Sequence, residues 1–299
     1  MPVDVTQTTI GNVLTRTTGY LRTVTSHSLQ PYRGCTFGRA LCGVGCYVRH
    51  NGHILRGRAW GDFLEVRTNA AESYLAHYDR EARWARQSSS IYTQEEARKI
   101  RPLRFSIFCS SSTDPFPPQE FQFGITRALL EAMVDRPPDE LVLQTHSHRV
   151  TAYLDLYPAL AKRCDLRFHV SIESDLDRLP GLPPPASSVE KRFAACATLK
   201  EAGLRTIVTV SPLLPMDDAE QFFARVAEAA DGVVLDHFIQ GDGSADGNRT
   251  FRTRLPEAMA RVNEFATALA YRDQMEAIAR RHLPGRVGIG IDGFAGRLT

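Results

Sequence analysis

The chain has 299 residues, and its 36 lysines and arginines nearly balance its 34 aspartates and glutamates, for a formal net charge of +2. This balance excludes a polycationic nucleic-acid binder held mainly by bulk charge. A hydrophobic fraction of 43% and a charged fraction of 23% are typical of a globular protein and exclude an intrinsically disordered chain. There is no run of about 18 apolar residues and the first residues are polar, so we expect no membrane span and a cytoplasmic location.

Short apolar runs rich in β-branched and aromatic residues alternate with longer segments of helical periodicity. The predicted strands are residues 104–109, 141–145, 166–172, 205–210, 233–237 and 287–291. The predicted helical segments are residues 124–134, 152–163, 193–202, 217–229 and 256–281. Gly203 is placed to end the third of these helices. This alternation predicts an α/β fold built from βα units around a buried parallel sheet, and the length suits a single βα barrel.

We expect residues 1–24 to form an N-terminal extension and residues 25–299 to form one barrel domain that ends in a helix and a strand. In a βα barrel, the loops after the carboxyl ends of the strands build the site. These loops are expected at residues 35–47, 110–114, 146–149, 173–175, 211–215 and 240–248. The last of them is predicted to be a mobile loop that covers the substrate.

Three of the six cysteines, Cys35, Cys42 and Cys46, fall within twelve positions with the spacing C-x6-C-x3-C. Such clustering favours a metal site over disulfide pairing. One alternative is a zinc site completed by His50 and His53. The other is an iron–sulfur cluster on three thiolates, which leaves one iron open for an external ligand.

The cysteines belong to a series of short motifs. These read QPYRGC at residues 30–35, CYVR at 46–49, WGDFLEVRTN at 60–69, SSTDPF at 111–116, VSIESD at 170–175, SSVEKRFAACATLKEAGL at 187–204 and VTVSPLLPMDD at 208–218. In this order they resemble the motifs of radical S-adenosylmethionine (SAM) enzymes, in particular the branch similar to spore photoproduct lyase and DNA repair photolyases. The resemblance covers roughly residues 12–240 and implies a partial (β/α)6-type TIM barrel with N- and C-terminal extensions.

The resemblance implies a lyase-like enzyme with a 4Fe-4S cluster on the three cysteines and SAM on the open iron. An electron from a flavodoxin- or ferredoxin-like donor would cleave SAM to methionine and a 5′-deoxyadenosyl radical, which abstracts hydrogen from the substrate. A nucleic-acid lesion is the substrate that the resemblance suggests. The alternatives are a radical SAM enzyme acting on a small molecule or a protein side chain, and a degenerate barrel that binds metal or nucleic acid without turnover.

The resemblance also assigns contacts to SAM. Ser112, Thr113 and Asp114 match positions near the SAM amino group, the alternative being a local cap of the next turn. His146 stands where the branch usually has a lysine that meets the SAM carboxylate, the alternative being a polar loop residue. The other matched positions are Tyr47, Ser171, Glu173 and Arg192.

The cysteine spacing departs from the usual C-x3-C-x2-C of the family. The longer loop must bulge to bring the same three sulfurs onto one cluster, and Gly34, Gly38, Gly43 and Gly45 are expected to supply the backbone conformations that this requires.

Cys109 is the candidate catalytic residue. In spore photoproduct lyase a cysteine near this strand end donates hydrogen to the substrate radical, and by its distance from the aspartate of the motif it aligns nearer Ser111. Residues 109 and 111 share a strand face, which predicts that the Cys109 thiol points into the barrel. The alternative is a buried thiol that packs as a small hydrophobic side chain.

Overall fold

The structure, a computed structural model, describes residues 2–87 and 103–299. Its main element is an eight-stranded sheet in the order β11-β10-β9-β8-β7-β6-β3-β2, in which the β2–β3 pair is antiparallel and the other pairs are parallel. The strands are β2 (Leu14–Arg16), β3 (His27–Leu29), β6 (Ser106–Cys109), β7 (Glu140–Thr145), β8 (Asp165–Ser171), β9 (Arg205–Val210), β10 (Gly232–Leu235) and β11 (Val287–Ile289). All six predicted strands are confirmed, because each begins and ends within two residues of its predicted limits.

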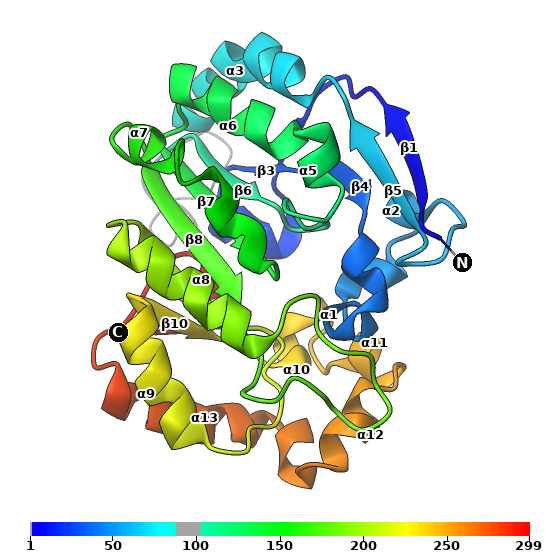
Figure 1. Ribbon diagram of the computed structural model, residues 1–299, viewed down its shortest axis with the longest axis vertical. Coiled ribbons are helices and arrows are strands. Elements are labelled where there is room, and N and C mark those ends of the chain that lie inside the picture. The colour runs from blue at the N-terminus through cyan, green and yellow to red at the C-terminus, as the bar shows by residue number, and fades with distance from the viewer. Residues whose placement is uncertain (1, 88–102) are drawn as a thin grey trace.

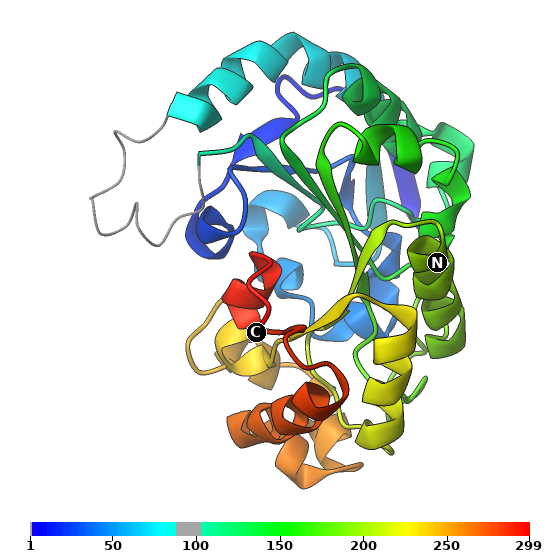
Figure 2. The ribbon, with the colours of Figure 1, turned by 90° about the vertical axis from the view of Figure 1, so that its left-hand side faces the viewer.

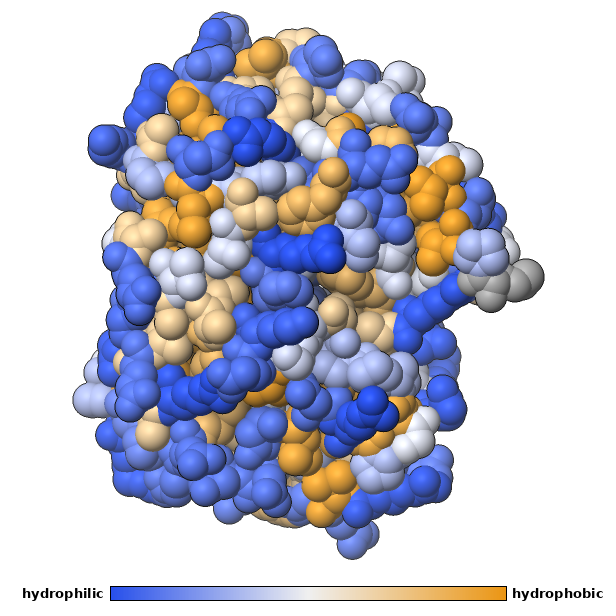
Figure 3. Space-filling model, viewed as in Figure 1, coloured by the Kyte–Doolittle hydropathy of each residue, from blue (hydrophilic) through white to orange (hydrophobic). Residues whose placement is uncertain are grey.

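Helices follow the strands and cover the outer face of the sheet (Figures 1 and 2). The longer ones are α3 (Ala70–Gln87), α6 (Ile125–Asp135), α8 (Val189–Glu201), α9 (Ala219–Ala229) and α13 (Leu269–His282). In the described part of the chain, none of the helices combines the length and the apolar character needed to cross a membrane. On the face shown in Figure 3, hydrophilic side chains cover most of the surface and apolar ones are dispersed among them.

Helix α8 ends just before Gly203, as predicted from the position of this glycine. Gly203 has a φ of 72°, in the left-handed region that favours glycine. Its N–H donates to the carbonyl of Lys200 at 2.9 Å, and the N–H of Leu204 donates to the carbonyl of Leu199 at 3.0 Å. These two bonds form a Schellman motif that leads the chain from α8 into β9.

Successive residues of a strand face opposite sides of the sheet. One set faces the inside of the curved sheet and forms a cluster with Phe294; its members are Phe108, Val142, Ile207 and Val234. Their neighbours in the sequence belong to the main core under the helices; these are Cys109, Leu143, Val208 and Leu235. The curved sheet therefore has a filled interior and a helix-covered exterior.

The sheet forms a partial barrel whose edge strands are β2 and β11. The short helices η1 (Gly19–Thr23) and α14 (Gly290–Phe294) lie side by side in the gap between the two edges (Figure 2). The ring of Tyr20 meets that of Phe294 edge-on, with 6.2 Å between the ring centroids. Segments from near both ends of the chain, η1 and α14, thus fill the gap between the edge strands β2 and β11.

A second sheet, in the order β1-β5-β4, stands beside the barrel (Figure 1). Its strands are β1 (Asp4–Thr8), β4 (Tyr32–Gly34) and β5 (Phe63–Arg67). Strand β4 ends directly before Cys35, so this small sheet fixes the start of the cysteine loop. Residues 2–24, expected as an extension, supply β1 to this sheet and β2 and η1 to the barrel.

Two predicted helical segments require correction, and one helix was not predicted. Residues 152–163 are helical only in part, since η5 (His148–Tyr153) ends before α7 (Tyr157–Ala161) begins. Residues 256–281, predicted as one helical segment, are divided into α12 (Leu255–Ala260), η6 (Glu264–Thr267) and α13. The break occurs because the side chain of Asn263 accepts a hydrogen bond from the N–H of Phe265 and starts a new turn. Helix α3, which the sequence reading missed, packs against α6.

Candidate active site

A cavity of about 500 Å³ lies at the carboxyl ends of the parallel strands, where βα barrels place their sites. The cysteine loop forms one wall, and the loops after β6, β7, β9 and β10 contribute to the others. Nine of the twelve predicted site residues line it: Cys35, Cys42, Cys46, Tyr47, Ser112, Thr113, Asp114, His146 and Ser171. Three others, Cys109, Glu173 and Arg192, lie outside its lining.

The cysteine loop folds into short helical turns that absorb its additional residues. Cys35 precedes η2 (Thr36–Arg39), Cys42 lies within α1 (Leu41–Val44), and Cys46 precedes η3 (Tyr47–His50). All three cysteines nevertheless line the same cavity. The unusual spacing is therefore compatible with three sulfurs that serve one site.

Glycines allow the backbone of this loop to pack tightly, but only Gly34 does so with a positive φ, of 81°. A Cβ on Gly43 would lie 2.1 Å from the carbonyl oxygen of Gly38, and a Cβ on Gly38 would lie 2.6 Å from the backbone of Gly61. Gly61 belongs to the Trp60-Gly61 motif, so this motif and the cysteine loop meet backbone to backbone. Gly38 and Gly43 are thus required for close approach rather than for unusual backbone angles.

If the cysteine loop holds the predicted cluster, Gly43→Ala is expected to remove most of the iron from the reconstituted protein. The new methyl group meets a backbone carbonyl, which cannot rotate away as a side chain can, so the turn that carries Cys42 must shift. Iron content after anaerobic reconstitution measures the effect. Gly52→Ala is the matched control, because a Cβ on Gly52 meets nothing within 4 Å. Wild-type iron content in Gly43→Ala would show that the loop tolerates a different backbone path.

The three thiols lie in an environment that disfavours an isolated thiolate. Burial raises the pKa of Cys35 to about 12, with Asp114 and Cys46 adding to the effect, and burial raises the pKa of Cys46 to about 11. Burial and then the neighbouring Cys35, Glu173 and Cys46 raise the pKa of Cys42 well above its usual value. Burial also raises the pKa of Cys164 and Cys196, so these shifts reflect burial, and three thiolates in this loop would need a bound cation to stabilise them.

The zinc alternative is not supported. His50 and His53 are exposed and line no part of the cavity. In residues 2–87 and 103–299, no three His, Cys, Asp or Glu side chains converge closely enough to bind a single ion. An iron–sulfur cluster on the three thiolates stays the prediction for this loop.

Asp114 and Thr113 tie the strand-end loops together. The carboxylate of Asp114 accepts hydrogen bonds from the N–H of Phe116 at 2.8 Å, from Thr145 Oγ1 at 2.8 Å and from the N–H of His146 at 2.7 Å. Thr113 Oγ1 donates to the carbonyl of Gly34 at 2.6 Å, next to the first cysteine. Asp114 therefore caps the next turn, as the structural alternative predicts, and also lines the cavity.

His146 lies between two buried carboxylates. Its Nε2 is 3.1 Å from Oε1 of Glu173, and its Nδ1 is 3.8 Å from Oδ2 of Asp114. Arg192 holds the other oxygen of Glu173 at 2.6 Å and also donates to the carbonyl of Ser171. Although burial opposes ionisation, Arg192 and His146 hold the pKa of Glu173 well below its usual range. Glu173 and Arg192 thus support His146 from behind the cavity wall.

Ser171 is already engaged in hydrogen bonds within the barrel. Its hydroxyl accepts from Gln144 Nε2 at 2.7 Å and bonds Thr209 Oγ1 at 3.0 Å. Oε1 of Gln144, which also lines the cavity, is buried without a hydrogen-bond partner. Gln144 was missed in the sequence because it lies inside a strand rather than in the loop that follows it.

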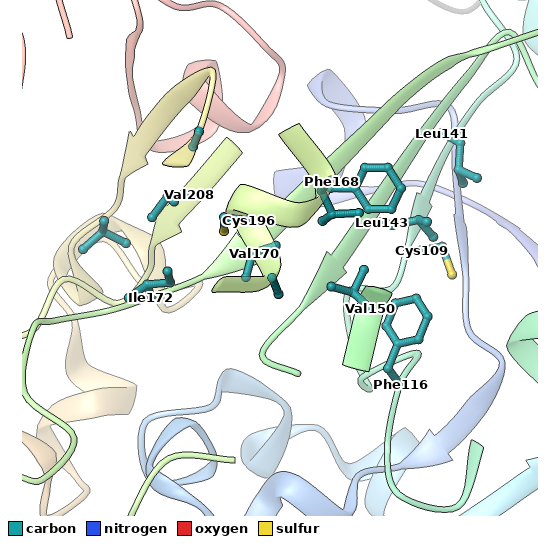
Figure 4. Close-up of a cluster of buried hydrophobic side chains, with 14 of the residues drawn as sticks. Cys109, Phe116, Leu141, Leu143, Val150, Phe168, Val170, Ile172, Cys196 and Val208 are labelled. Carbon is teal, nitrogen blue, oxygen red and sulfur yellow. The ribbon is translucent and has the colours of Figure 1, made fainter. Parts of the chain in front are cut away.

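The prediction that Cys109 looks into the barrel is wrong. The preceding Phe108 faces the interior, so alternation turns Cys109 outward. Its side chain is 3% exposed and lies in the hydrophobic core near Phe116 and Leu143 (Figure 4). The alternative of a buried thiol that packs as a small hydrophobic side chain is confirmed.

The loop at residues 240–248 does line the cavity, with Gly241, Asp242 and Gly243. Asp242 orders it, because its carboxylate accepts hydrogen bonds from the N–H of Ser244 and the N–H of Thr250, both at 2.8 Å. The loop leads into α11 (Asn248–Phe251), which packs against η3 of the cysteine loop.

The chain has the fold of spore photoproduct lyase. A variant of that enzyme with a dinucleoside spore photoproduct superposes with a TM-score of 0.58 at 16% identity, covering 95% of this chain and 80% of that one. The enzyme complexed with the same dinucleoside gives 0.56 at 16% identity, covering 95% and 81%. An uncharacterized protein of Methanocaldococcus jannaschii is 30% identical over 118 residues, which is 39% of this chain and less than half, 44%, of that protein. No family model matches the chain.

Proposed function

We propose that the chain is a radical SAM enzyme in which Cys35, Cys42 and Cys46 hold a 4Fe-4S cluster. The observation that carries the proposal is that three thiols from one short loop line the same cavity as the polar loops after β6 and β7. When bound, the cluster and SAM supply reductive cleavage of the sulfonium and a 5′-deoxyadenosyl radical. The fold shared with spore photoproduct lyase supports the proposal.

The residues around His146 suit the carboxylate of SAM. Each ring nitrogen of His146 lies near a buried carboxylate, Nε2 near Glu173 and Nδ1 near Asp114. His146 stands where the resembling enzymes have a lysine that meets the SAM carboxylate. Glu173 and Arg192 fix the ring, while Asp114 fixes the backbone of the same residue.

An interloop hydrogen bond and three phenylalanine rings line part of the proposed reaction cavity. Tyr47 donates its hydroxyl to the carbonyl of Ser111 at 2.7 Å and so bridges the cysteine loop to the loop after β6. Phe37, Phe108 and Phe294 supply apolar lining. A dry cavity protects a carbon radical from side reactions, which is the part of the chemistry that the protein itself must provide.

Formation of 5′-deoxyadenosine tests the proposed function. The protein is reconstituted anaerobically with iron and sulfide, and dithionite replaces the flavodoxin- or ferredoxin-like electron donor. Addition of SAM is expected to yield 5′-deoxyadenosine and methionine in equal amounts, measured by chromatography. A protein with full iron occupancy that forms neither product would favour a barrel that binds metal without turnover.

For the substrate we propose a nucleic-acid lesion, on the basis of a cationic group at the cavity. Arg249 lines the cavity. Burial lowers the pKa of His50 most, and the nearby Arg49, Arg249 and Arg252 lower it further, so the three arginines lie near this histidine. These side chains come from η3 and the neighbourhood of α11, which pack together. Arginines clustered beside the cavity would supply locally the charge for phosphate contacts that the balanced chain lacks overall.

Arg249→Ala combined with Arg252→Ala is expected to weaken DNA binding and to reduce the salt dependence. Removal of each arginine that binds a phosphate reduces the slope of log K against log salt by about 1. Binding of a fluorescent oligonucleotide over a series of salt concentrations measures the slope. Arg261→Ala is the control, because Arg261 is an exposed arginine paired with Glu257 on α12. An unchanged slope in the double variant would favour a small molecule or a protein side chain as substrate.

A further inference from the structure

One carboxylate in the cavity has no role in the function proposed above. Asp236 directly follows β10, lines the cavity and is 7% exposed. It lies at the carboxyl end of a barrel strand, where barrel enzymes place the residues that meet substrate. Asp236 was not predicted as a site residue because the predicted strand extends to residue 237, whereas β10 ends at Leu235.

The carboxylate of Asp236 has few partners. Its Oδ2 accepts one hydrogen bond, from Ser211 Oγ at 3.1 Å. Among the residues that the structure describes, no Lys, Arg or His forms an ion pair with it; Arg272 acts on it only from further away. A buried carboxylate normally has a counter-ion or several hydrogen-bond donors. Asp236 therefore keeps acceptor capacity that the protein itself does not use.

The surroundings of Asp236 keep this capacity available. A Cβ on Gly241 would lie 2.6 Å from Oδ2 and 2.8 Å from Oδ1 of Asp236, so a glycine is required for the carboxylate to occupy its place. Burial raises the pKa of Asp236 to about 6, with Asp242 adding to the effect and Ser211 and Arg272 opposing it. At pH 8 the group is ionised and still lacks a donor besides Ser211.

The other side chains in this part of the cavity indicate the shape of what binds. Phe108 and Phe294 line it with apolar rings, 6.4 Å apart between centroids. Tyr20, which also lines the cavity, has a buried hydroxyl without a hydrogen-bond partner. The two rings meet edge to face, at 63°, and form an apolar corner beside one acceptor and one free hydroxyl, which suits a small ring with polar edges.

We propose that Asp236 is a specificity-determining residue that accepts an N–H hydrogen bond from a planar group of the substrate held against Phe108 and Phe294. The hydroxyl of Tyr20 provides a second polar contact to the same group. The inference rests on the proposed function, since it takes this cavity as the substrate site. It adds a recognition element outside the cysteine loop and the residues assigned to SAM.

Binding of small probes to the full-length protein at pH 8 tests the assignment. Thymidine offers a neutral imide N–H, benzamidine offers cationic N–H groups, and N3-methylthymidine has the shape of thymidine without the imide donor. Asp236→Asn keeps the size of the side chain and an oxygen for Ser211, but it replaces one acceptor oxygen with a donor NH2. We expect thymidine or benzamidine to bind Asp236→Asn about tenfold more weakly than the wild type, and N3-methylthymidine to bind both equally.

Asp292→Asn is the matched control. Asp292 is an exposed carboxylate on α14 that acts on Tyr20 electrostatically, as Asp236 does, and pairs with Arg297. Asp292→Asn is expected to bind the probes as the wild type does. Preference for thymidine identifies a neutral donor in the substrate, and preference for benzamidine identifies a cationic one. Equal affinity of the wild type and Asp236→Asn for both donor probes, or no saturable binding of either to the wild type, would overturn the inference.

The two proposals fail separately. Probe binding is measured without SAM or reductant, so it does not depend on the cluster chemistry. Deoxyadenosine formation together with probe binding that ignores Asp236 would overturn only this inference. Probe binding that depends on Asp236 in a protein that cannot cleave SAM would overturn only the proposed radical chemistry.

Discussion

Cys42→Ala is expected to abolish the brown colour and most of the bound iron of the reconstituted protein, and with them the formation of 5′-deoxyadenosine. Cys42 lies in the middle of the cysteine loop and lines the same cavity as Cys35 and Cys46. With three protein thiolates for four irons, loss of one leaves a cluster with too few ligands to persist. Absorbance in the visible range and iron analysis measure the change.

The control for this experiment is Cys196→Ala. Cys196 is fully buried in α8 and belongs to the main hydrophobic core rather than to the cavity. Its replacement is expected to leave iron content and colour unchanged. Normal iron in Cys42→Ala would mean that the ligands have been assigned wrongly, and loss of iron in both variants would indicate a general effect on folding.

The parallel strands could be predicted because a strand buried on both faces is a continuous apolar run. Residues 205–210, for example, are predicted and observed with the same limits. Strands β2 and β3 have three residues each, and runs this short carry no periodicity that distinguishes a strand from a loop. Their place in the sheet depends on pairing with each other and with β6, which is a tertiary contact.

The site could be predicted where chemistry and spacing are local. The three cysteines and the polar loops after the strands were identified in this way, and nine of the twelve residues line one cavity. The direction in which the Cys109 side chain points could not be predicted, because a shift of one residue turns a strand side chain to the other side of the sheet. The contacts of His146 with Asp114 and Glu173 join three different loops, and no spacing along the chain encodes them.

Asp236→Asn is expected to stabilise the folded protein at pH 8. Burial raises the carboxyl pKa from its usual 3.8 to about 6 in the folded chain, which costs the folded state roughly 3 kcal/mol once the group is ionised. Arg272 and Ser211 oppose this shift, whereas Asp242 strengthens it, and Tyr20 on η1 is acted on by the same carboxylate. Asparagine at this position carries no charge to bury, so the variant avoids the cost.

The sign of the effect gives the experiment its pH dependence. Between about pH 4 and pH 6 the folded chain binds more protons at Asp236 than the unfolded chain, so the contribution of Asp236 to stability falls as pH rises and is fully unfavourable above pH 6. Urea unfolding of Asp236→Asn should therefore give a free energy up to about 3 kcal/mol above the wild type at pH 8, and the two proteins should converge near pH 4.

The exposed carboxylate of Asp292 provides the comparison, since Asp292→Asn is expected to change stability by less than about 0.5 kcal/mol at either pH. If Asp236→Asn is no more stable than the wild type at pH 8, other interactions in the folded protein must offset the cost of burying the ionised carboxylate. If the gain is found, Asp236 weakens the protein at neutral pH, which is the trade-off between stability and function expected of a carboxylate retained for binding.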